Sequence, residues 1–350
     1  MKKIAVLALG ALLINACSGS SESSSSNEPV TLTVLAHDSF TPSEGIFDAF
    51  TASTGIKVEI VRAGDAGELV TKAALTAGNP EGDVLWGVDN TLLSRALDAD
   101  IFSRYETPNI ASMSEEVLRN IPGHEVTPVD TGDVCINYDI AWFEENNIAP
   151  PMTLDALTSS TYANLLVVPS AITSSPGLAF FLATVAEYGD SGWQEYWKSL
   201  RKNGVLVVDG WTQAYSIEFS GSSGKGDRPI VVSYSSSPAA EVLFSNPPTE
   251  VAPTATAPLT CFTQIEYAGV LRGTKHEKEA QQLIDYLTDV TFQSDLPLTQ
   301  FVYPVNQLAN IPDSFTQYIS RPENPLTMEF DVIAKNRAAW LDEWSTIVFK

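Results

Sequence analysis

Basic side chains are scarce in this sequence. The chain of 350 residues has 20 Lys and Arg against 43 Asp and Glu, which gives a formal net charge of −23 at pH 7. Nucleic-acid binding needs a basic surface that neutralises phosphates, so this balance argues against a nucleic-acid partner. It argues equally against adhesion to anionic lipid by charge. It favours cationic ligands, although a spread acidic surface often serves only solubility.

Histidine is scarce as well, and the usual catalytic patterns are missing. No pair among His37, His124 and His276 has metal-ligand spacing, so we expect no metal. Glycine patterns for nucleotide phosphates are absent, and we expect no cofactor. The pattern G-x-S-x-G is absent too, and Ser222–Lys225 matches S-x-x-K without a K-T-G partner. We therefore predict that the protein is not an enzyme, with a serine hydrolase as the least favoured alternative.

The first apolar run is too short to cross a bilayer. Lys2 and Lys3 precede the small and apolar residues of Ile4–Ile14, whereas a membrane span needs ~20 residues. We interpret residues 1–16 as a secretory signal. The last residues before Cys17 resemble a bacterial lipobox, which implies cleavage before Cys17 and a lipid anchor on its sulfur. An ordinary signal followed by a chance cysteine is the alternative.

Residues 17–30 predict a flexible tether between the anchor and the fold, because they are rich in serine. About 320 residues follow the tether, more than one typical domain, so we expect two lobes. Predicted strands and helices alternate in two units along this part, which indicates an α/β fold with parallel strands. Thr41 and Asp65 are each predicted to cap a helix of the first unit.

Two extended runs, Asp133–Asp139 and Leu259–Tyr267, lie between the two units. A chain that leaves one lobe, builds the other and returns would cross at these runs. They predict a two-strand hinge with a ligand cleft between a first lobe (31–135 and 263–350) and a second lobe (136–262). Cys135 and Cys261 lie one in each run. They form either a disulfide, which an extracytoplasmic compartment permits, or two buried thiols.

Seven short stretches in order along the mature chain carry a family resemblance. They are "HDSF" (His37–Phe40), "DVLWGVDNTLL" (Asp83–Leu93), "NYD" (Asn137–Asp139), "TSSPGLAF" (Thr173–Phe180), "GWTQAY" (Gly210–Tyr215), "VVSYSSSPA" (Val231–Ala239) and "VYPV" (Val302–Val305). With them the chain resembles the substrate-binding proteins of ABC importers, in the type II periplasmic-binding-protein fold, and more narrowly their thiamine-binding branch. The resemblance implies thiamine or a thiamine phosphate as ligand and an ABC permease as partner; we expect a monomer. Polyamine and ferric-iron binders share the topology and are the alternatives.

The first-lobe candidates for ligand contact follow strands or begin helices. His37 and Asp38 come directly after the first strand, and a carboxylate of the family falls at Asp65. Carboxylates there would suit an aminopyrimidine donor or a ring cation. Asp65 could equally serve only as a helix cap. Phe301 and Tyr303 lie near the end of the chain, and Tyr303 has the alternative of a packed strand residue.

The second-lobe candidates combine hydroxyls with rings. Ser174 and Ser175 lie at a predicted helix start that could receive a phosphate, with a plain helix cap by Ser175 as the alternative. Trp211 and Tyr234 are at strand ends, where the resemblance places ligand aromatics; Trp211 could instead pack beneath the cleft. Their faces would stack on a pyrimidine and attract a cationic thiazolium.

Three positions depart from the family pattern. His37 and Ala240 stand where relatives carry tyrosine, and Phe301 stands where they carry tryptophan. Phe301 keeps a stacking face, whereas Ala240 removes one. These changes predict a pocket that is roomier or filled differently.

Overall fold

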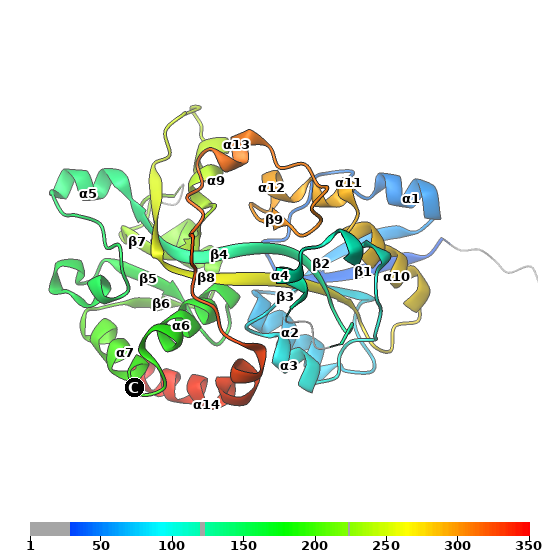
Figure 1. Cartoon of the computed structure of the whole chain (residues 1–350), viewed down its shortest axis with the longest axis horizontal. Helices are drawn as coiled ribbons and strands as arrows, with labels where there is room; N and C mark the ends of the chain where they lie inside the picture. Colours follow the sequence, from blue (N-terminus) through cyan, green and yellow to red (C-terminus); the bar gives the residue numbers. More distant parts are fainter. Residues whose placement is uncertain (1–28, 120–122, 223–224) are drawn as a thin grey trace, which may run out of the picture.

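The computed structural model of the chain describes residues 29–119, 123–222 and 225–350. One sheet crosses the molecule in the strand order β2-β1-β3-β8-β4-β7-β5-β6, and β9 pairs with β4 (Figure 1). The strands are β1 (Thr31–Ala36), β2 (Lys57–Arg62), β3 (Val84–Asp89), β4 (Thr127–Asp139), β5 (Leu166–Pro169), β6 (Leu206–Val208), β7 (Ile230–Tyr234), β8 (Thr254–Val270) and β9 (Tyr303–Pro304).

Helices follow most of the strands, as the alternating pattern predicts. Those of the first half are α1 (Asp48–Thr54), α2 (Ala66–Leu75), α3 (Leu93–Asp98), α4 (Glu115–Leu118), α5 (Ile140–Asn146), α6 (Ser175–Tyr188) and α7 (Trp193–Lys202). Those of the second half are α8 (Trp211–Gln213), which continues into one π-helical turn, α9 (Ser237–Leu243), α10 (Glu277–Leu287), α11 (Val290–Gln293), α12 (Leu296–Thr299), α13 (Asp313–Thr316) and α14 (Phe330–Phe349).

Two long antiparallel strands connect two lobes. The C-terminal half of β8 pairs with β3, the C-terminal half of β4 pairs with β7, and β4 and β8 pair with each other between them. Strands β1, β2 and β3 are parallel on one side, and β5, β6 and β7 are parallel on the other. The two lobes therefore share one sheet, and β4 and β8 form the predicted hinge; the lobe boundaries between 135 and 136 and between 262 and 263 stay a prediction.

Cys135 and Cys261 form a disulfide between the two hinge strands. The bond lies where the register of β4 and β8 shifts, between Val134 and Ile136. Thr260 fills the local break in the ladder, because its hydroxyl accepts a hydrogen bond from the Ile136 N–H at 2.9 Å. The bond thus fastens the hinge strands at the point where backbone pairing is interrupted.

A third segment joins the hinge, which the sequence did not predict. After α13 the chain runs across β4 and β8 before it reaches α14 (Figure 1). Leu326 pairs with β8 there: its N–H donates to the Cys261 carbonyl at 2.8 Å, and its carbonyl accepts from the Thr263 N–H at 2.9 Å. The chain therefore passes the hinge three times.

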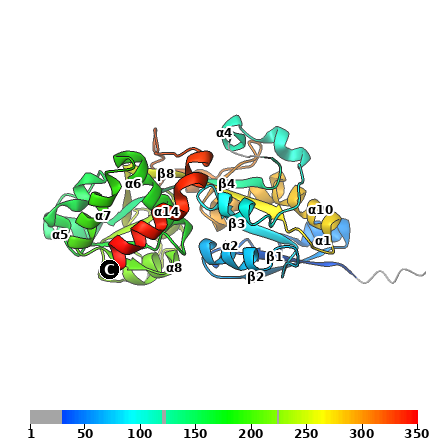
Figure 2. The same ribbon diagram turned by 90° about the horizontal axis from the view of Figure 1, so that it is seen from below.

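The last helix packs mainly against the second lobe, whereas we expected it, with the rest of 263–350, in the first lobe; that lobe assignment stays a prediction. Trp344 of α14 is fully buried, and its ring centroid lies 5.3 Å from that of Trp197 on α7. Figure 2 shows α14 along the α6 and α7 side. The helix also makes a smaller contact with α3 of the first lobe. Burial of the Trp344 ring against α7 stabilises α14 on the second lobe, because a large aromatic side chain gains most free energy when it is fully enclosed.

The helix predicted from Thr41 starts later than expected. The first residue of α1 is Asp48, and Thr41 does not cap it. Ser43 instead donates to the Asp295 carboxylate through its N–H at 2.9 Å and its hydroxyl at 2.5 Å. A long-range carboxylate therefore takes the donors that a local cap would have used.

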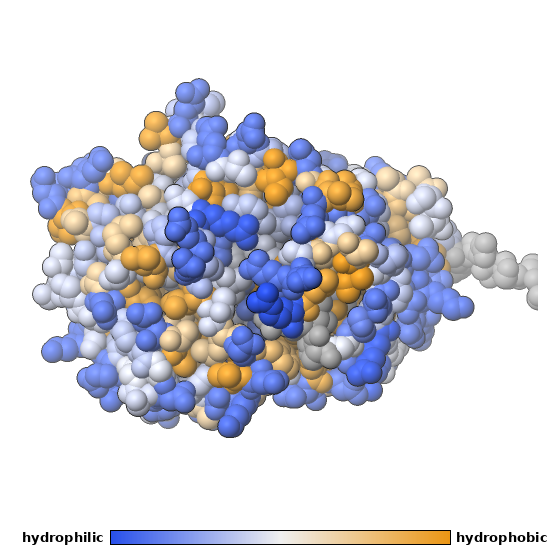
Figure 3. Space-filling view, viewed as in Figure 1, coloured by the Kyte–Doolittle hydropathy of each residue, from blue (hydrophilic) through white to orange (hydrophobic). Residues whose placement is uncertain are grey.

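The surface in Figure 3 mixes polar residues with small apolar groups on the face that it shows. Within the described residues, no helix has the length and apolar character that a bilayer crossing requires. The signal prediction for residues 1–16, the lipidation of Cys17 and most of the tether lie outside the described residues.

Candidate functional site

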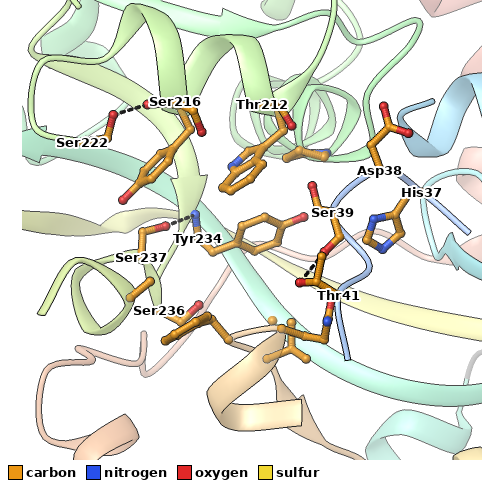
Figure 4. A pocket seen from close by; sticks show the side chains of 18 of the residues that line it. His37, Asp38, Ser39, Thr41, Thr212, Ser216, Ser222, Tyr234, Ser236 and Ser237 are labelled. Atoms are coloured by element: carbon orange, nitrogen blue, oxygen red, sulfur yellow. Dashed lines mark hydrogen bonds between the residues drawn. The ribbon is translucent and has the colours of Figure 1, made fainter. Parts of the chain in front are cut away.

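A cavity of about 860 Å³ lies between the lobes, above the hinge strands. Its volume is within the range of about 300–1,000 Å³ that is typical of small-molecule sites. Figure 4 shows His37, Asp38, Ser39 and Thr41 of the first lobe on one side of the cavity, facing Tyr234 of the second. The loop after β1 and the end of β7 thus meet at the cavity, as expected for loops at the carboxyl ends of strands.

The second lobe contributes a stack of aromatic rings. Trp211 begins α8, and its ring lies parallel to that of Tyr215, with centroids 5.1 Å apart and planes 9° apart. Tyr234, at the end of β7, meets the Trp211 ring edge-on at 6.3 Å. All three rings line the cavity; Trp211 and Tyr234 stay partly exposed, whereas Tyr215 is buried against Trp211. Trp211 therefore presents one ring face to a ligand, and Tyr215 supports the other.

A chain of hydroxyls fixes the orientation of the indole. The Trp211 Nε1–H donates to the Ser233 hydroxyl at 2.9 Å, and the Ser233 and Ser237 hydroxyls are 2.8 Å apart. Ser237 also accepts from the Tyr234 N–H at 3.2 Å. Both serines are buried. The serines of "VVSYSSSPA" thus hold the two cavity aromatics in one arrangement.

Asp65 of the first lobe serves both as a helix cap and as a contact across the cleft. One carboxylate oxygen accepts from the Ala66 N–H at 2.7 Å, which confirms the predicted cap of α2. The other accepts from the Trp211 N–H of the second lobe at 2.9 Å. The sequence left two roles open for Asp65, helix cap and site residue. The geometry is compatible with both, because one oxygen serves the cap and the other faces the second lobe.

A second cross-cleft contact joins backbone to backbone. The Gly67 N–H of α2 donates to the Thr173 carbonyl of the second lobe at 2.9 Å. A Cβ atom at Gly67 would lie 2.5 Å from that oxygen, closer than a real contact permits. Glycine is therefore required at this position for the lobes to approach as they do. The structure represents a closed arrangement of the two lobes.

Three carboxylates lie in one row across adjacent strands, and two of them form part of the cavity floor. Asp89 of β3, Glu266 of β8 and Asp130 of β4 are register partners on three adjacent strands. Asp89 and Asp130 are almost fully buried, and Asp130 and Glu266 line the cavity. β-Bulges flank the row in β3 and at Pro128 in β4, and bulges commonly re-aim side chains near functional sites.

Burial and mutual repulsion shift the proton affinity of this row. Burial, followed by the charge of Glu266, raises the pKa of Asp89 to about 7. The same two causes raise the pKa of Asp130 well above its ordinary value. Burial and the surrounding carboxylates, with Glu266 first among them, also raise the pKa of Tyr234. A cluster perturbed in this way inside a cleft is typical of a functional site.

His37 is the basic residue beside this row. Its Nε2 lies 3.6 Å from a Glu266 carboxylate oxygen. Burial lowers the pKa of His37, but the carboxylates of Glu266, Asp65 and Asp38 together raise it more, so the net shift of this pKa is upward. The His37 ring lies so close to Gly87 that a Cβ atom there would be 2.3 Å from it. Asp38, by contrast, is exposed and accepts from the Gly64 N–H at 3.0 Å.

The predicted phosphate site at the start of α6 is only partly in the cavity. Ser175 lines it, but its hydroxyl accepts from the Gln264 amide at 3.1 Å. Ser174 is buried outside the lining, and its hydroxyl has no hydrogen-bond partner. Ser175 makes no cap either; the N-cap residue is Ser174, without a side-chain hydrogen bond.

The aromatic candidates near the end of the chain separate into two groups. Phe301 lines the cavity with a left-handed backbone (φ 55°), and its ring lies 5.3 Å from that of Phe244. A bulky residue rarely adopts this conformation, so the surrounding structure must hold it. Tyr303 lies outside the lining and packs in β9 under the Arg321 guanidinium, 4.3 Å from its ring centroid. Ala240 also lines the cavity, and the roomier pocket stays a prediction.

Sequence reasoning missed the hinge residues that form the floor: Asp130, Gln264 and Glu266. Gln264 and Glu266 are two apart in a strand of mostly apolar residues, which places both on one face. That spacing was a usable signal. Within the described residues, no group of three or more His, Cys, Asp or Glu side chains is arranged to hold a metal ion.

The comparisons with known proteins agree with this geometry. A family model described as bacterial extracellular solute-binding protein matches residues 79–336. The chain is 28% identical over 326 residues to the thiamine-binding periplasmic protein of Escherichia coli (strain K12), covering 91% of this chain and 93% of that protein. It is 27% identical over 321 residues to the protein of the same name from Salmonella typhimurium, covering 91% and 93%.

Solved structures extend the likeness to the fold. A structure described as a periplasmic thiamin binding protein has a TM-score of 0.78 and 26% identity, and the match covers 91% of this chain and 96% of that one. AfuA from Actinobacillus pleuropneumoniae has a TM-score of 0.76 at 14% identity, with 92% and 99% covered. The second match supports the type II periplasmic-binding-protein fold alone.

Proposed function

The chain belongs to the family of bacterial extracellular solute-binding proteins, and we propose that it captures thiamine or a thiamine phosphate for an ABC importer. The observation that carries this proposal is the cavity itself. A stacked indole, Trp211, faces a floor of carboxylates across a space large enough for a two-ring cation. Thiamine combines a flat aminopyrimidine with a cationic thiazolium, so it can use both the ring face and the charge.

The capture mechanism follows from the contacts across the cleft. Asp65 and Gly67 of the first lobe bond to Trp211 and Thr173 of the second only when the lobes are closed. A ligand seated between Trp211 and the carboxylates contacts both lobes in that state, so binding favours closure. The closed form then docks on a membrane permease, which takes up the ligand when the cleft reopens. This is a binding role and uses no chemical step.

Titration calorimetry of the mature chain tests the proposal. Thiamine and its phosphates are titrated in parallel with spermidine and ferric citrate, the ligand classes of the alternative binders. We expect saturable binding of at least one thiamine compound, with micromolar or tighter affinity. Binding of spermidine or ferric citrate, together with no binding of any thiamine compound, would contradict the proposal and indicate a binder of another ligand class with the same fold.

We further propose that the protein is lipid-anchored outside the cytoplasm through Cys17 and works as a monomer. The lipobox-like residues before Cys17 and the serine-rich tether support the anchor. Phase partitioning in detergent separates the options: the native chain should enter the detergent phase, and a Cys17→Ser variant should remain in the aqueous phase. Sedimentation of the soluble variant tests the monomer.

A further inference from the structure

The carboxylate row on the cavity floor is an arrangement that folding alone does not favour. Like charges placed directly opposite on neighbouring strands destabilise a sheet. Asp89, Glu266 and Asp130 occupy three such positions side by side, two of them almost fully buried. Hydrogen bonds relieve Asp89, which accepts from Thr91 at 2.7 Å and from Gln264 at 2.8 Å. Asp130 accepts no hydrogen bond from a donor among the described residues, and burial together with the adjacent Glu266 carboxylate raises its pKa well above the ordinary value.

Two buried acceptors beside the row have no donor. The Oδ2 atom of Asp130 and the Oε1 atom of Gln264 make no hydrogen bond, although the two side chains are 1% and 2% exposed. Both residues line the cavity. A buried acceptor without a partner costs about 1–3 kcal/mol. A ligand that brings N–H donors to this floor would recover that cost, whereas a ligand that brings only acceptors would not.

The rest of the lining has the same sign. Of the described residues that line the cavity, none is Lys or Arg, and the acidic ones are Asp38, Asp65, Glu68, Asp130, Asp209, Glu241 and Glu266. His37 is the one basic side chain among them, and Glu266 already pairs with it. A phosphate ester carries up to two negative charges, and the one side chain in this lining that could balance them, His37, is already paired with Glu266.

The start of α6 does not supply the missing receptor. The Ser175 hydroxyl is engaged by Gln264, and Ser174 lies outside the lining. Position two of the helix is Pro176, which has no N–H to offer. The start of α6 therefore holds Gln264 of the floor in place through Ser175 and offers few donors to a phosphate.

We propose that the floor formed by Asp130, Gln264 and Glu266 selects an unesterified organic cation with N–H donors, and that it discriminates against phosphate esters of that cation. Under the proposed function, on which this inference rests, the preferred ligand is thiamine itself. Its amino group and ring cation meet the free acceptors, and each added phosphate brings negative charge into a cavity of carboxylates.

Titration calorimetry at fixed ionic strength tests this selection with thiamine, thiamine monophosphate and thiamine pyrophosphate. We expect affinity to fall at least tenfold from thiamine to the monophosphate, and to fall again to the pyrophosphate. Equal or tighter binding of the monophosphate would overturn the selection while leaving the proposed function in place. Absence of binding by all three compounds would overturn both.

The variant Glu266→Gln tests whether the floor causes the preference for thiamine over its phosphate esters. It should weaken thiamine binding about tenfold and leave the monophosphate nearly unchanged, so that the ratio between the two narrows. Glu59→Gln makes the same change on the exposed β2 strand of the same sheet and should alter neither affinity. An unchanged ratio in Glu266→Gln would overturn the role of the floor. Asp130→Asn provides the same readout if the first variant unfolds, as judged by its melting curve.

Discussion

The first lobe presents carboxylates to the cavity, whereas the second presents flat rings. Asp38 and Asp65 stand on loops at strand ends of the first lobe, and Trp211 and Tyr234 stand on the second. The rings are held in place by stacking and by buried serines, while Asp65 is held partly by the opposite lobe. The first lobe thus supplies the charged groups and the second lobe supplies the stacking surfaces. A ligand that contacts both kinds of group must bring the two lobes together.

Removing the ring face of the second lobe should have the largest effect. Trp211→Ala deletes the stacking surface and a cation–π contact, which together contribute on the order of 2–3 kcal/mol. We expect thiamine affinity to fall about 100-fold, measured by calorimetry. Trp211→Phe keeps a ring and should lose much less. Ser233→Ala, which only releases the indole N–H, should cost about threefold; a loss as large as that of Trp211→Ala would mean that positioning, rather than stacking, dominates.

Neutralising the first lobe tests the other half of the comparison. Asp65→Asn removes the charge and replaces one of two acceptor oxygens with a donor, so either the α2 cap or the bond to Trp211 is lost. We expect roughly a tenfold loss of affinity. Asp289→Asn is the matched control, since Asp289 caps α11 outside the cavity. Equal losses in both variants would reduce Asp65 to a helix cap.

A substitution that opposes closure of the lobes, at a residue outside the cavity lining, tests whether ligand binding depends on closure. Gly67→Ala puts a methyl group against the Thr173 carbonyl only in the closed form. Affinity should fall by about three- to tenfold, an overpacking cost of about 1 kcal/mol, while the melting temperature of the ligand-free protein stays the same. Small-angle scattering with saturating thiamine should show a larger radius than for the native chain. A lower melting temperature without ligand would show instead that α2 packing was damaged.

The smallest effect concerns the buried end of the carboxylate row, Asp89 on β3. Asp89 has its pKa raised to about 7 in the folded chain, so over the interval from about 4 to about 7 the folded state keeps a proton that the unfolded chain has lost. Stability from this group is complete at low pH and is lost as pH rises through about 7. The melting temperature of the ligand-free protein should fall by a few degrees between about pH 5 and pH 8. Asp89→Asn should flatten that fall in part, since Asp130 contributes in the same direction.

Much of this architecture follows from local signals in the sequence. The strand-end positions of Trp211 and Tyr234, the cap by Asp65 and the two hinge runs depend on short-range patterns of apolar and capping residues. Their positions in the structure agree with those patterns because each position is determined by residues close to it in the sequence.

The features that were missed depend on partners far along the chain. Asp89, Asp130 and Glu266 form a row only through the strand order, which a single sequence does not specify. The Ser175 hydroxyl, which we expected to be available to a phosphate, accepts a hydrogen bond from Gln264, 89 residues away. Ser43 likewise bonds to Asp295, 252 residues away, instead of starting a helix. Long-range hydrogen bonds therefore reassign polar residues whose local pattern indicates something else.

The segment at Leu326 has a consequence for how far the cleft can open. It is hydrogen-bonded to both sides of Phe262 on β8, next to the disulfide, and it leads directly into α14. Trp344 fixes the far end of α14 to α7, so that end must travel with the second lobe. The tail is thus attached at the pivot and at one moving arm. When the lobes part, the smaller contact between α14 and α3 has to change, because α3 moves with the first lobe while α14 stays with the second.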